Sequence, residues 1–226
     1  AWNMIVRGFM SGAYIAMGAA LATVCSTAVA DNLGAGFGQL ILGAVFPVGL
    51  IITVLTGAEL FTGDAMLAPL AAFHNKVTWA KVLNLWVWVY IGNLIGSIFF
   101  AYIMANGPFV SFNAAGLATV NAFGLRAVTI GLAKTSYVGG MGFYSALLKG
   151  LGCNWLVNLA ILLGICADDA IGKFFGIWFP IMAFVSIGFE HSVANMYFIP
   201  AGILTSGYLN AEQVATFTAE KLASLN

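Results

Sequence analysis

The sequence predicts an all-α membrane protein, and both its composition and the spacing of its charges support this prediction. Of the 226 residues, 62% are hydrophobic and 7% are charged, and the mean hydropathy is +0.98. A soluble domain carries about 25% charged residues, so this chain lacks the polar side chains that would cover a water-exposed surface. Arg7 and Asp31 enclose 23 uncharged residues, and Lys81 and Arg126 enclose 44. Apolar windows of this length are typical of membrane-spanning helices.

The same composition excludes several classes of protein. A soluble enzyme, a disordered chain and a disulfide scaffold do not have this content of apolar residues. Nucleic-acid binding is also excluded, because the eight acidic and eight basic residues cancel and form no basic patch. Cys25, Cys153 and Cys166 lie in apolar runs without metal-ligand spacing. We therefore expect no metal, no cofactor and no disulfide.

The uncharged windows place five membrane spans along the chain. We expect them at residues 5–30, 38–73, 80–105, 141–166 and 174–203. The connection 106–140 is rich in Gly, Asn and Ser, and its apolar stretch 114–133 could form a short helix near one surface. A polar helix is expected over 211–225.

The second and fifth spans are too long and too interrupted to be simple helices. The second contains Gly57-Ala58-Glu59-Leu60-Phe61-Thr62-Gly63-Asp64, and the fifth contains Gly188-Phe189-Glu190-His191-Ser192. Glycine and charge here indicate a broken helix, and non-helical backbone near the middle of a membrane is tolerated only inside protein or along a watery cavity. Broken helices in matching positions of two halves indicate a transport site. Glu59 and Glu190 are 131 residues apart, and the chain crosses the membrane an odd number of times between these two mid-membrane points, from the second span to the fifth. The two halves are therefore predicted to be inverted repeats.

Four glycines are predicted to lie where spans cross. Gly92 and Gly96 form a Gly-x-x-x-Gly pattern, and Gly12 and Gly18 lie in the first span. Such spacing allows two helix backbones to approach closely.

Three stretches of the chain resemble the formate/nitrite transporter family. They are Gly57-Ala58-Glu59-Leu60-Phe61-Thr62-Gly63, Cys153-Asn154-Trp155-Leu156-Val157 and Gly188-Phe189-Glu190-His191-Ser192-Val193-Ala194-Asn195-Met196. The resemblance runs over nearly the whole chain. It implies an aquaporin-like fold of six helices in two inverted halves, and a homopentamer in the cell (inner) membrane with one pore per protomer. The family passes small monovalent anions: formate, nitrite, hydrosulfide and sometimes acetate or lactate.

The sequence departs from this family pattern at its two ends. The short amphipathic helix that normally precedes the first span is absent, and so is the sixth span. We therefore expect residues 1–226 to be a single transmembrane channel domain that has been trimmed at both ends, with five of the six spans present.

His191 is the candidate proton donor for a permeating anion. A bare charge at the centre of a bilayer costs several kcal/mol or more, and a donor that neutralises the anion in transit would remove that cost. An imidazole titrates near physiological pH, and His191 lies beside Glu190 in the second break. The alternative is a neutral histidine that bonds to backbone in a packed turn.

Two further polar residues enter the expected pathway through the resemblance. Thr62 would face His191 and donate to an anion, or instead cap the half-helix that follows. Asn154 would bond near the central cavity, or instead hold two helices together.

The resemblance also implies two apolar constrictions. Phe46 and Phe184 would form the extracytoplasmic one, and Leu50, Leu60 and Val157 the cytoplasmic one. Narrow apolar rings exclude hydrated ions. Without the resemblance, these five residues would be ordinary core or lipid-facing positions.

The remaining candidates shape the breaks or their electrostatics. Glu59 and Glu190 are expected to accept backbone N–H bonds or to stay protonated, and so to fix the loop geometry together with Gly57 and Gly63. By resemblance, Lys134 raises the positive potential near the pore. Lys149, a turn before Asn154, is an alternative for that role, or its side chain reaches to an interface.

We thus expect a membrane channel or transporter for a small monovalent anion, most simply formate, with proton coupling through His191 and no enzymatic activity. Nitrite or hydrosulfide is the alternative substrate. A neutral-solute pore would need paired Asn-Pro-Ala boxes, which this sequence lacks. An intramembrane enzyme would need clustered ligands or a nucleophile–base pair beside His191, and the sequence offers neither.

Overall fold

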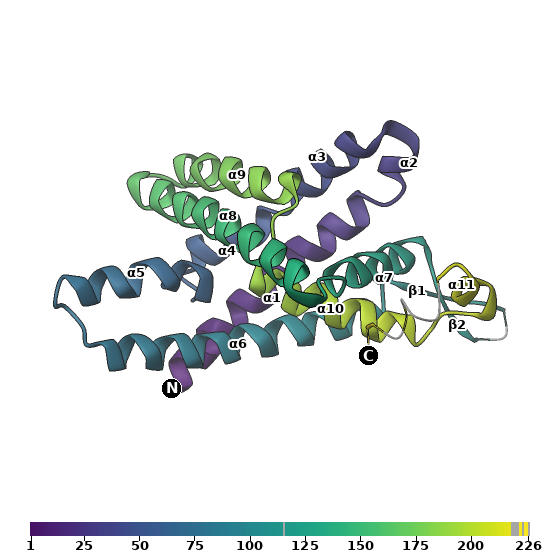
Figure 1. Ribbon diagram of the computed structural model, residues 1–226, viewed down its shortest axis with the longest axis horizontal. Helices are drawn as coiled ribbons and strands as arrows, with labels where there is room; N and C mark the ends of the chain where they lie inside the picture. The colour runs from purple at the N-terminus through teal and green to yellow at the C-terminus, as the bar shows by residue number, and fades with distance from the viewer. Residues whose placement is uncertain (115, 218–221, 223, 226) are drawn as a thin grey trace.

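The computed structural model describes residues 1–226 except 115, 218–221, 223 and 226, and this part of the chain is a bundle of helices with one small hairpin (Figure 1). In it, five segments are long and apolar enough to cross a membrane. They are α1 (Trp2–Cys25), α3 with α4 (Ala35–Val45 and Val48–Thr56), α6 (Trp79–Asn106), α8 (Gly139–Cys166) and α9 (Ala170–Ile187). The five predicted spans are confirmed, and the second and fifth are interrupted as expected. Their second parts are α5 (Phe61–Phe73) and α10 (Ser192–Ser206).

The connection 106–140 holds more structure than the sequence predicted. Strands β1 (Val110–Phe112) and β2 (Ala118–Val120) pair antiparallel as a hairpin, and α7 (Ala122–Lys134) follows. The helix starts later than the expected residue 114 because Asn121 caps it: its side-chain oxygen accepts a hydrogen bond from Gly124 N at 3.0 Å. In Figure 1 the hairpin lies at one end of the molecule, close to α11 (Ala211–Ala215).

The predicted helix over 211–225 is shorter in the structure. It begins at a capping box formed by Asn210 and Gln213, and it ends at Ala215. Residues 218–221 and 223 of this segment lie outside the described residues. A short helix, α2 (Val29–Leu33), links α1 to α3.

Helices α1 and α6 pack backbone against backbone. A Cβ atom on Gly12 would lie 2.1 Å from the carbonyl oxygen of Asn93, and one on Gly96 would lie 2.0 Å from that of Phe9. A Cβ atom on Gly92 would lie 2.6 Å from Ile5 O, which is also closer than any side chain allows. The packing role predicted for these glycines is confirmed, because no side chain fits in the contact.

Both breaks have the same local structure. Gly57 ends α4 at φ +69° and Gly188 ends α9 at φ +85°, in the left-handed region that glycine enters without strain. Each is followed by a short extended stretch. That stretch ends at Leu60 in the first break and at His191 in the second, and both have φ near −116°.

The two breaks also share their backbone hydrogen bonds. Gly57 N donates to Val54 O at 3.3 Å, and Gly188 N donates to Val185 O at 3.1 Å. The bond from Ala58 N to Thr53 O is likewise matched by the bond from Phe189 N to Phe184 O. All four matched pairs are separated by 131 residues, which is the interval that the sequence suggested.

The repeats run in opposite directions. After the first break the chain completes its crossing through α5, returns through α6, crosses again through α8 and returns through α9 to the second break. The 13 residues of α7 span about 20 Å, which is too short to add a crossing. The fold is therefore a helical membrane bundle of two inverted halves, as predicted.

The α1–α6 contact gives a direct test of this packing. We expect Gly96→Ala to destabilise the protein by about 1–3 kcal/mol, because its Cβ would force the two backbones apart. Thermal unfolding in detergent should show a lower midpoint. Gly150→Ala in α8 is the control, since nothing lies within 4 Å of its Cβ position. Equal midpoints for both variants would contradict the close contact.

Candidate functional site

His191 is buried at the second break and fixed by its neighbours. It is 4% exposed, it is the N-cap of α10, and its ring stacks on Phe184 with the ring centroids 5.7 Å apart. The Nδ1 atom accepts a hydrogen bond from the backbone N–H of Ala194 at 3.0 Å. His191 thus bonds to backbone in a packed turn, as the alternative to a proton donor predicted. Its ring also lies among the residues that were predicted to line the pathway.

This backbone bond determines which ring nitrogen carries the proton. An Nδ1 atom that accepts a bond has no hydrogen, so in the neutral imidazole the proton is on Nε2. Nε2 lies 3.1 Å from Thr62 Oγ1. Nε2–H therefore donates to the Thr62 hydroxyl, and the hydroxyl hydrogen remains available for another acceptor.

Thr62 lies in the first turn of α5 and is held through its backbone. Its carbonyl oxygen accepts a hydrogen bond from Asn154 Nδ2 of α8 at 3.1 Å. The Oδ1 atom of Asn154 in turn accepts from Asn158 Nδ2 at 2.8 Å. The N-cap residue of α5, Leu60, makes no side-chain cap bond, and the Phe61 N–H at the start of the helix donates to Asn93 Oδ1 of α6 at 3.0 Å. The Thr62 hydroxyl therefore does not serve as the cap. Asn154 connects two helices and positions Thr62.

The five apolar residues of the two expected constrictions are all buried and belong to one apolar cluster. None of these side chains is more than 4% exposed. The five residues are Phe46, Leu50, Leu60, Val157 and Phe184. Phe46 and Phe184 meet edge to face, with ring centroids 5.8 Å apart. Because Phe184 also stacks on His191, the aromatic pair lies directly beside the polar centre.

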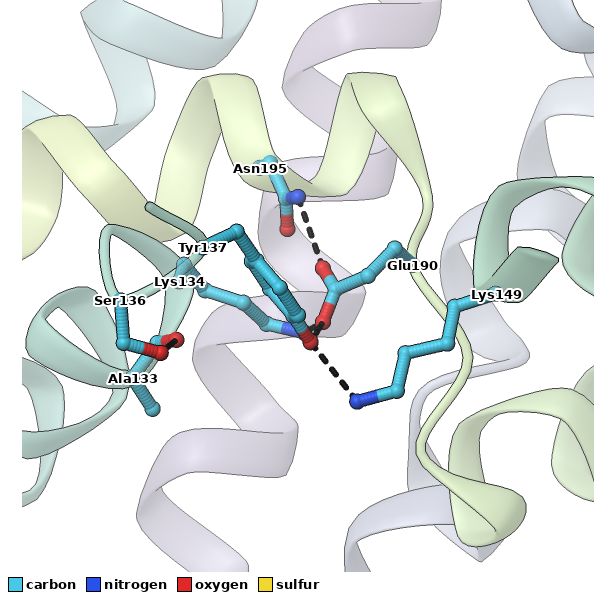
Figure 2. Close-up of polar contacts among 7 residues, drawn as sticks. All are labelled: Ala133, Lys134, Ser136, Tyr137, Lys149, Glu190 and Asn195. Carbon is cyan, nitrogen blue, oxygen red and sulfur yellow. Dashed lines mark hydrogen bonds and ion pairs between the residues drawn. The ribbon is translucent and has the colours of Figure 1, made fainter. Parts of the chain in front are cut away.

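Glu190 is the centre of a hydrogen-bonded network, which Figure 2 shows. Its Oε1 accepts from Lys134 Nζ at 2.8 Å and from the hydroxyl of Tyr137 at 2.7 Å, and its Oε2 accepts from Asn195 Nδ2 at 2.9 Å. Lys149 Nζ donates to the Tyr137 hydroxyl at 2.9 Å. The two lysines, which the sequence offered as alternatives, therefore bind to the same carboxylate, one directly and one through a tyrosine.

Glu59 has the matching position in the first break, and its partner is Arg7. Arg7 Nη1 lies 2.7 Å from Glu59 Oε1, and the guanidinium also donates to Gly57 O. The two glutamates thus bind basic side chains, where the sequence analysis expected backbone N–H groups. Gly63 lies in regular helix in the first turn of α5, whereas Gly57 has the positive φ of the break.

The first helix of each half supports the break through its backbone as well. Glu59 N donates to Arg7 O at 3.3 Å, and Glu190 N donates to Lys149 O at 3.4 Å. Arg7 in α1 and Lys149 in α8 are therefore equivalent residues in the two halves.

A cavity of about 240 Å³ opens beside His191. It is lined by Phe46, Phe184, His191 and Asn195 together with residues of α7. Arg126 and Lys134 are among its lining residues, and no carboxylate from the described part of the chain lines it. We call this space the α7 cavity.

Sequence reasoning missed Tyr137 and Arg126. Both lie in or next to the connection 106–140, where no motif identifies them and where only the fold brings them to the second break. Tyr137 and Glu190 are 53 positions apart in the sequence, so no short motif contains both residues and indicates their contact.

The fold and this site define a class of protein. A multi-pass helical bundle with two inverted breaks, which bring buried hydrogen-bond donors together between apolar residues, is a membrane channel or transporter rather than an enzyme.

Comparison with known proteins gives the family. The sequence model described as Formate/nitrite transporter matches residues 1–223, and the chain belongs to this family. A probable formate transporter of Methanothermobacter thermautotrophicus is 44% identical over 218 residues, which cover 91% of this chain and 76% of that protein. The formate channel BtFdhC of Bacillus thuringiensis is 40% identical over 209 residues, which cover 91% of this chain and 74% of that one.

Solved structures agree with this assignment. A structure described as a pentameric formate channel with formate bound has a TM-score of 0.76 and is 28% identical. The similarity covers 99% of this chain and 90% of that one. A channel of the same family gives an equal TM-score at 26% identity, covering 99% of this chain and 82% of the other.

The Tyr137 bridge generates a testable prediction. Tyr137→Phe removes the hydroxyl that joins Lys149 to Glu190, and we expect a loss of about 1 kcal/mol of stability. Lys149→Met should cost much less in the Tyr137→Phe background than in the wild type, because its partner is already gone. Thermal unfolding of the two single variants and the double variant measures this coupling.

Tyr144→Phe, an exposed tyrosine of α8, is the matched control and should leave the midpoint unchanged. Strictly additive losses in the three variants would contradict the bridge.

Proposed function

We propose that the protein conducts a small monovalent anion through each protomer, with formate as the main substrate. The Thr62–His191 pair carries this proposal, because it places two hydrogen-bond donors at a buried point between apolar residues. The names of the relatives, which include formate transporters and channels, support the choice of formate. We further propose that the protein assembles as a homopentamer, as the pentameric formate channel does.

The geometry suggests how the energetic cost of the charge is lowered. The Thr62 hydroxyl hydrogen can donate to an anion at the break, and His191 Nε2–H can do so when it exchanges the Thr62 oxygen for the anion. Hydrogen bonds to ionised acceptors are about twice as strong as neutral ones. The N-terminal ends of α5 and α10 also begin at the breaks, and their helix dipoles favour negative charge there.

The proposed path follows from the burial of the apolar residues. An anion enters from the α7 cavity, passes Phe46 and Phe184, and reaches Thr62 and His191. It leaves past Leu50, Leu60 and Val157. By resemblance the Phe46–Phe184 end is extracytoplasmic. Each apolar constriction removes water, so the donors at the centre must replace the lost hydration.

Proton transfer from His191 is a finer part of the proposal. A neutral His191 can only donate a hydrogen bond, because loss of its Nε2 proton would leave an imidazolate. Transfer therefore starts from the imidazolium: the Nε2–H bond breaks, an O–H bond of formic acid forms, and neutral His191 remains. The imidazolium carries a hydrogen on Nδ1, and transfer from Nε2 leaves a neutral ring with that hydrogen still in place. The bond from Ala194 N is therefore lost from the protonation of Nδ1 until the Nδ1 hydrogen leaves to water and Nε2 takes up a new proton.

Uptake into proteoliposomes tests the function and the substrate. Formate, nitrite and hydrosulfide are compared at pH 5 and pH 7.5, and we expect formate uptake to be highest and to rise at the lower pH. Uptake led by another anion would retain the channel but overturn formate as substrate. If glycerol entered and the anions did not, the protein would be a neutral-solute pore.

His191→Asn isolates the contribution of the imidazole. Asparagine can still cap α10, so the fold is retained while the titratable ring is lost. We expect formate flux to fall about tenfold or more and its increase at pH 5 to disappear. His74→Asn, which changes an exposed histidine after α5, should leave both unchanged. An unaltered pH dependence in His191→Asn would rule out the proton-donor role.

Thr62→Val tests the hydroxyl separately. The change keeps the shape of the side chain but removes a donor, so we expect a several-fold lower flux at every pH, on the order of one hydrogen bond to a charged group. Thr62→Ser should restore most of the flux. If valine and serine behaved alike, the hydroxyl would have no part in conduction.

A further inference from the structure

One wall of the α7 cavity is a stripe along α7. Arg126, Thr129, Ala133 and Lys134 recur at helical spacing and all line the cavity. The Thr129 hydroxyl already donates to Leu125 O at 2.9 Å. The two cationic residues are eight positions apart, so Arg126 lies about 12 Å farther along α7 than Lys134, which contacts the second break.

The two cations differ in how they are bonded. Lys134 is paired with Glu190. Arg126 takes part in neither of the two ion pairs within the described residues, and its Nε is buried without a hydrogen-bond partner. The exposed carboxylate of Asp31 is close enough to attract Arg126 but forms no ion pair with it. A buried donor that lacks an acceptor is costly, and Arg126 lines the cavity, so its guanidinium is close to any acceptor that enters there.

We propose that Arg126 is an outer binding site that captures the anion before it reaches Thr62 and His191, and that it favours planar anions with two oxygens. This inference rests on the proposed function. A guanidinium presents parallel N–H groups in a rigid fork that matches the two oxygens of a carboxylate. Formate and nitrite have that geometry, whereas hydrosulfide offers a single sulfur atom. The positive charge also concentrates any anion at the entrance.

Binding of the anion at Arg126 and its passage through the constrictions affect different kinetic quantities. Binding determines the half-saturating concentration, and passage determines the maximal rate. In proteoliposomes we expect Arg126→Gln to raise the half-saturating concentration of formate and of nitrite about three- to tenfold. The maximal rate should stay within about twofold, because Thr62 and His191 are unchanged. The half-saturating concentration of hydrosulfide should rise less, since it loses only the charge. Arg126→Lys restores the charge but not the fork, so it should recover hydrosulfide capture more completely than formate capture.

Two control variants accompany these measurements. Lys76→Gln removes a positive charge from the exposed loop between α5 and α6, away from the cavity, and should change no half-saturating concentration. Asp31→Asn removes the competing carboxylate and should lower the value for formate. If Arg126 served only to bind Asp31, Asp31→Asn would reproduce the defect of Arg126→Gln, which would overturn the proposal.

A chemical test avoids the question of folding. Arg126→Cys is purified, reconstituted, and then treated with a cationic or an anionic methanethiosulfonate, and the wild type is treated in parallel to account for Cys25, Cys153 and Cys166. We expect the cationic adduct to lower the half-saturating concentration of formate and the anionic adduct to raise it. Equal effects of both reagents would contradict the proposal.

The failure of this inference is distinguishable from the failure of the proposed function. If the wild type carries formate and Arg126→Gln has the same half-saturating concentration, Arg126 is not a binding site and the channel remains. If the wild type carries no anion, the proposed function and this inference fail together.

Discussion

The structure depends on satisfying the backbone at two places where a helix stops inside the membrane. A break exposes N–H and C=O groups where no water is available to bond them, so each needs a partner from the protein. The first helix of each half supplies it: Arg7 O and Lys149 O accept from Glu59 N and Glu190 N. Basic side chains then bind the two glutamates. The helices that build the bundle therefore also complete the hydrogen bonding of the two breaks.

The two halves match in backbone and differ in chemistry. Arg7 binds Glu59 directly, whereas Lys149 reaches Glu190 through Tyr137, and Lys134 from α7 adds a second cation. The residue that precedes the second part of each broken helix is leucine in the first half and histidine in the second. An apolar constriction and a polar centre thus occupy equivalent positions. The two halves of the pathway thus differ because different side chains occupy equivalent positions of the same repeated backbone.

Much of the fold was accessible from the sequence, since glycine beside glutamate inside an apolar run has few structural explanations. The spans, both breaks and their inversion followed from that pattern. The hairpin did not, because three-residue strands among Gly, Asn and Ser give no periodicity. Thr62 and His191 were expected to face each other through a family resemblance, and their separation is 3.1 Å. Tyr137 and Arg126 lie in a connection without a motif, and only the three-dimensional arrangement shows their surroundings.

The contact between α1 and α6 has a consequence for how such proteins diverge. These helices approach each other closely at Gly12, Gly92 and Gly96, and Asn93 and Ser97 of α6 donate side-chain hydrogen bonds to the α1 carbonyls of Gly8 and Gly12. Most of this contact thus depends on small residues and main-chain atoms. A substitution among the residues that line the pathway therefore does not require a second substitution in the contact between α1 and α6. Assembly and solute choice are therefore largely separate tasks, and natural selection can alter one while preserving the other.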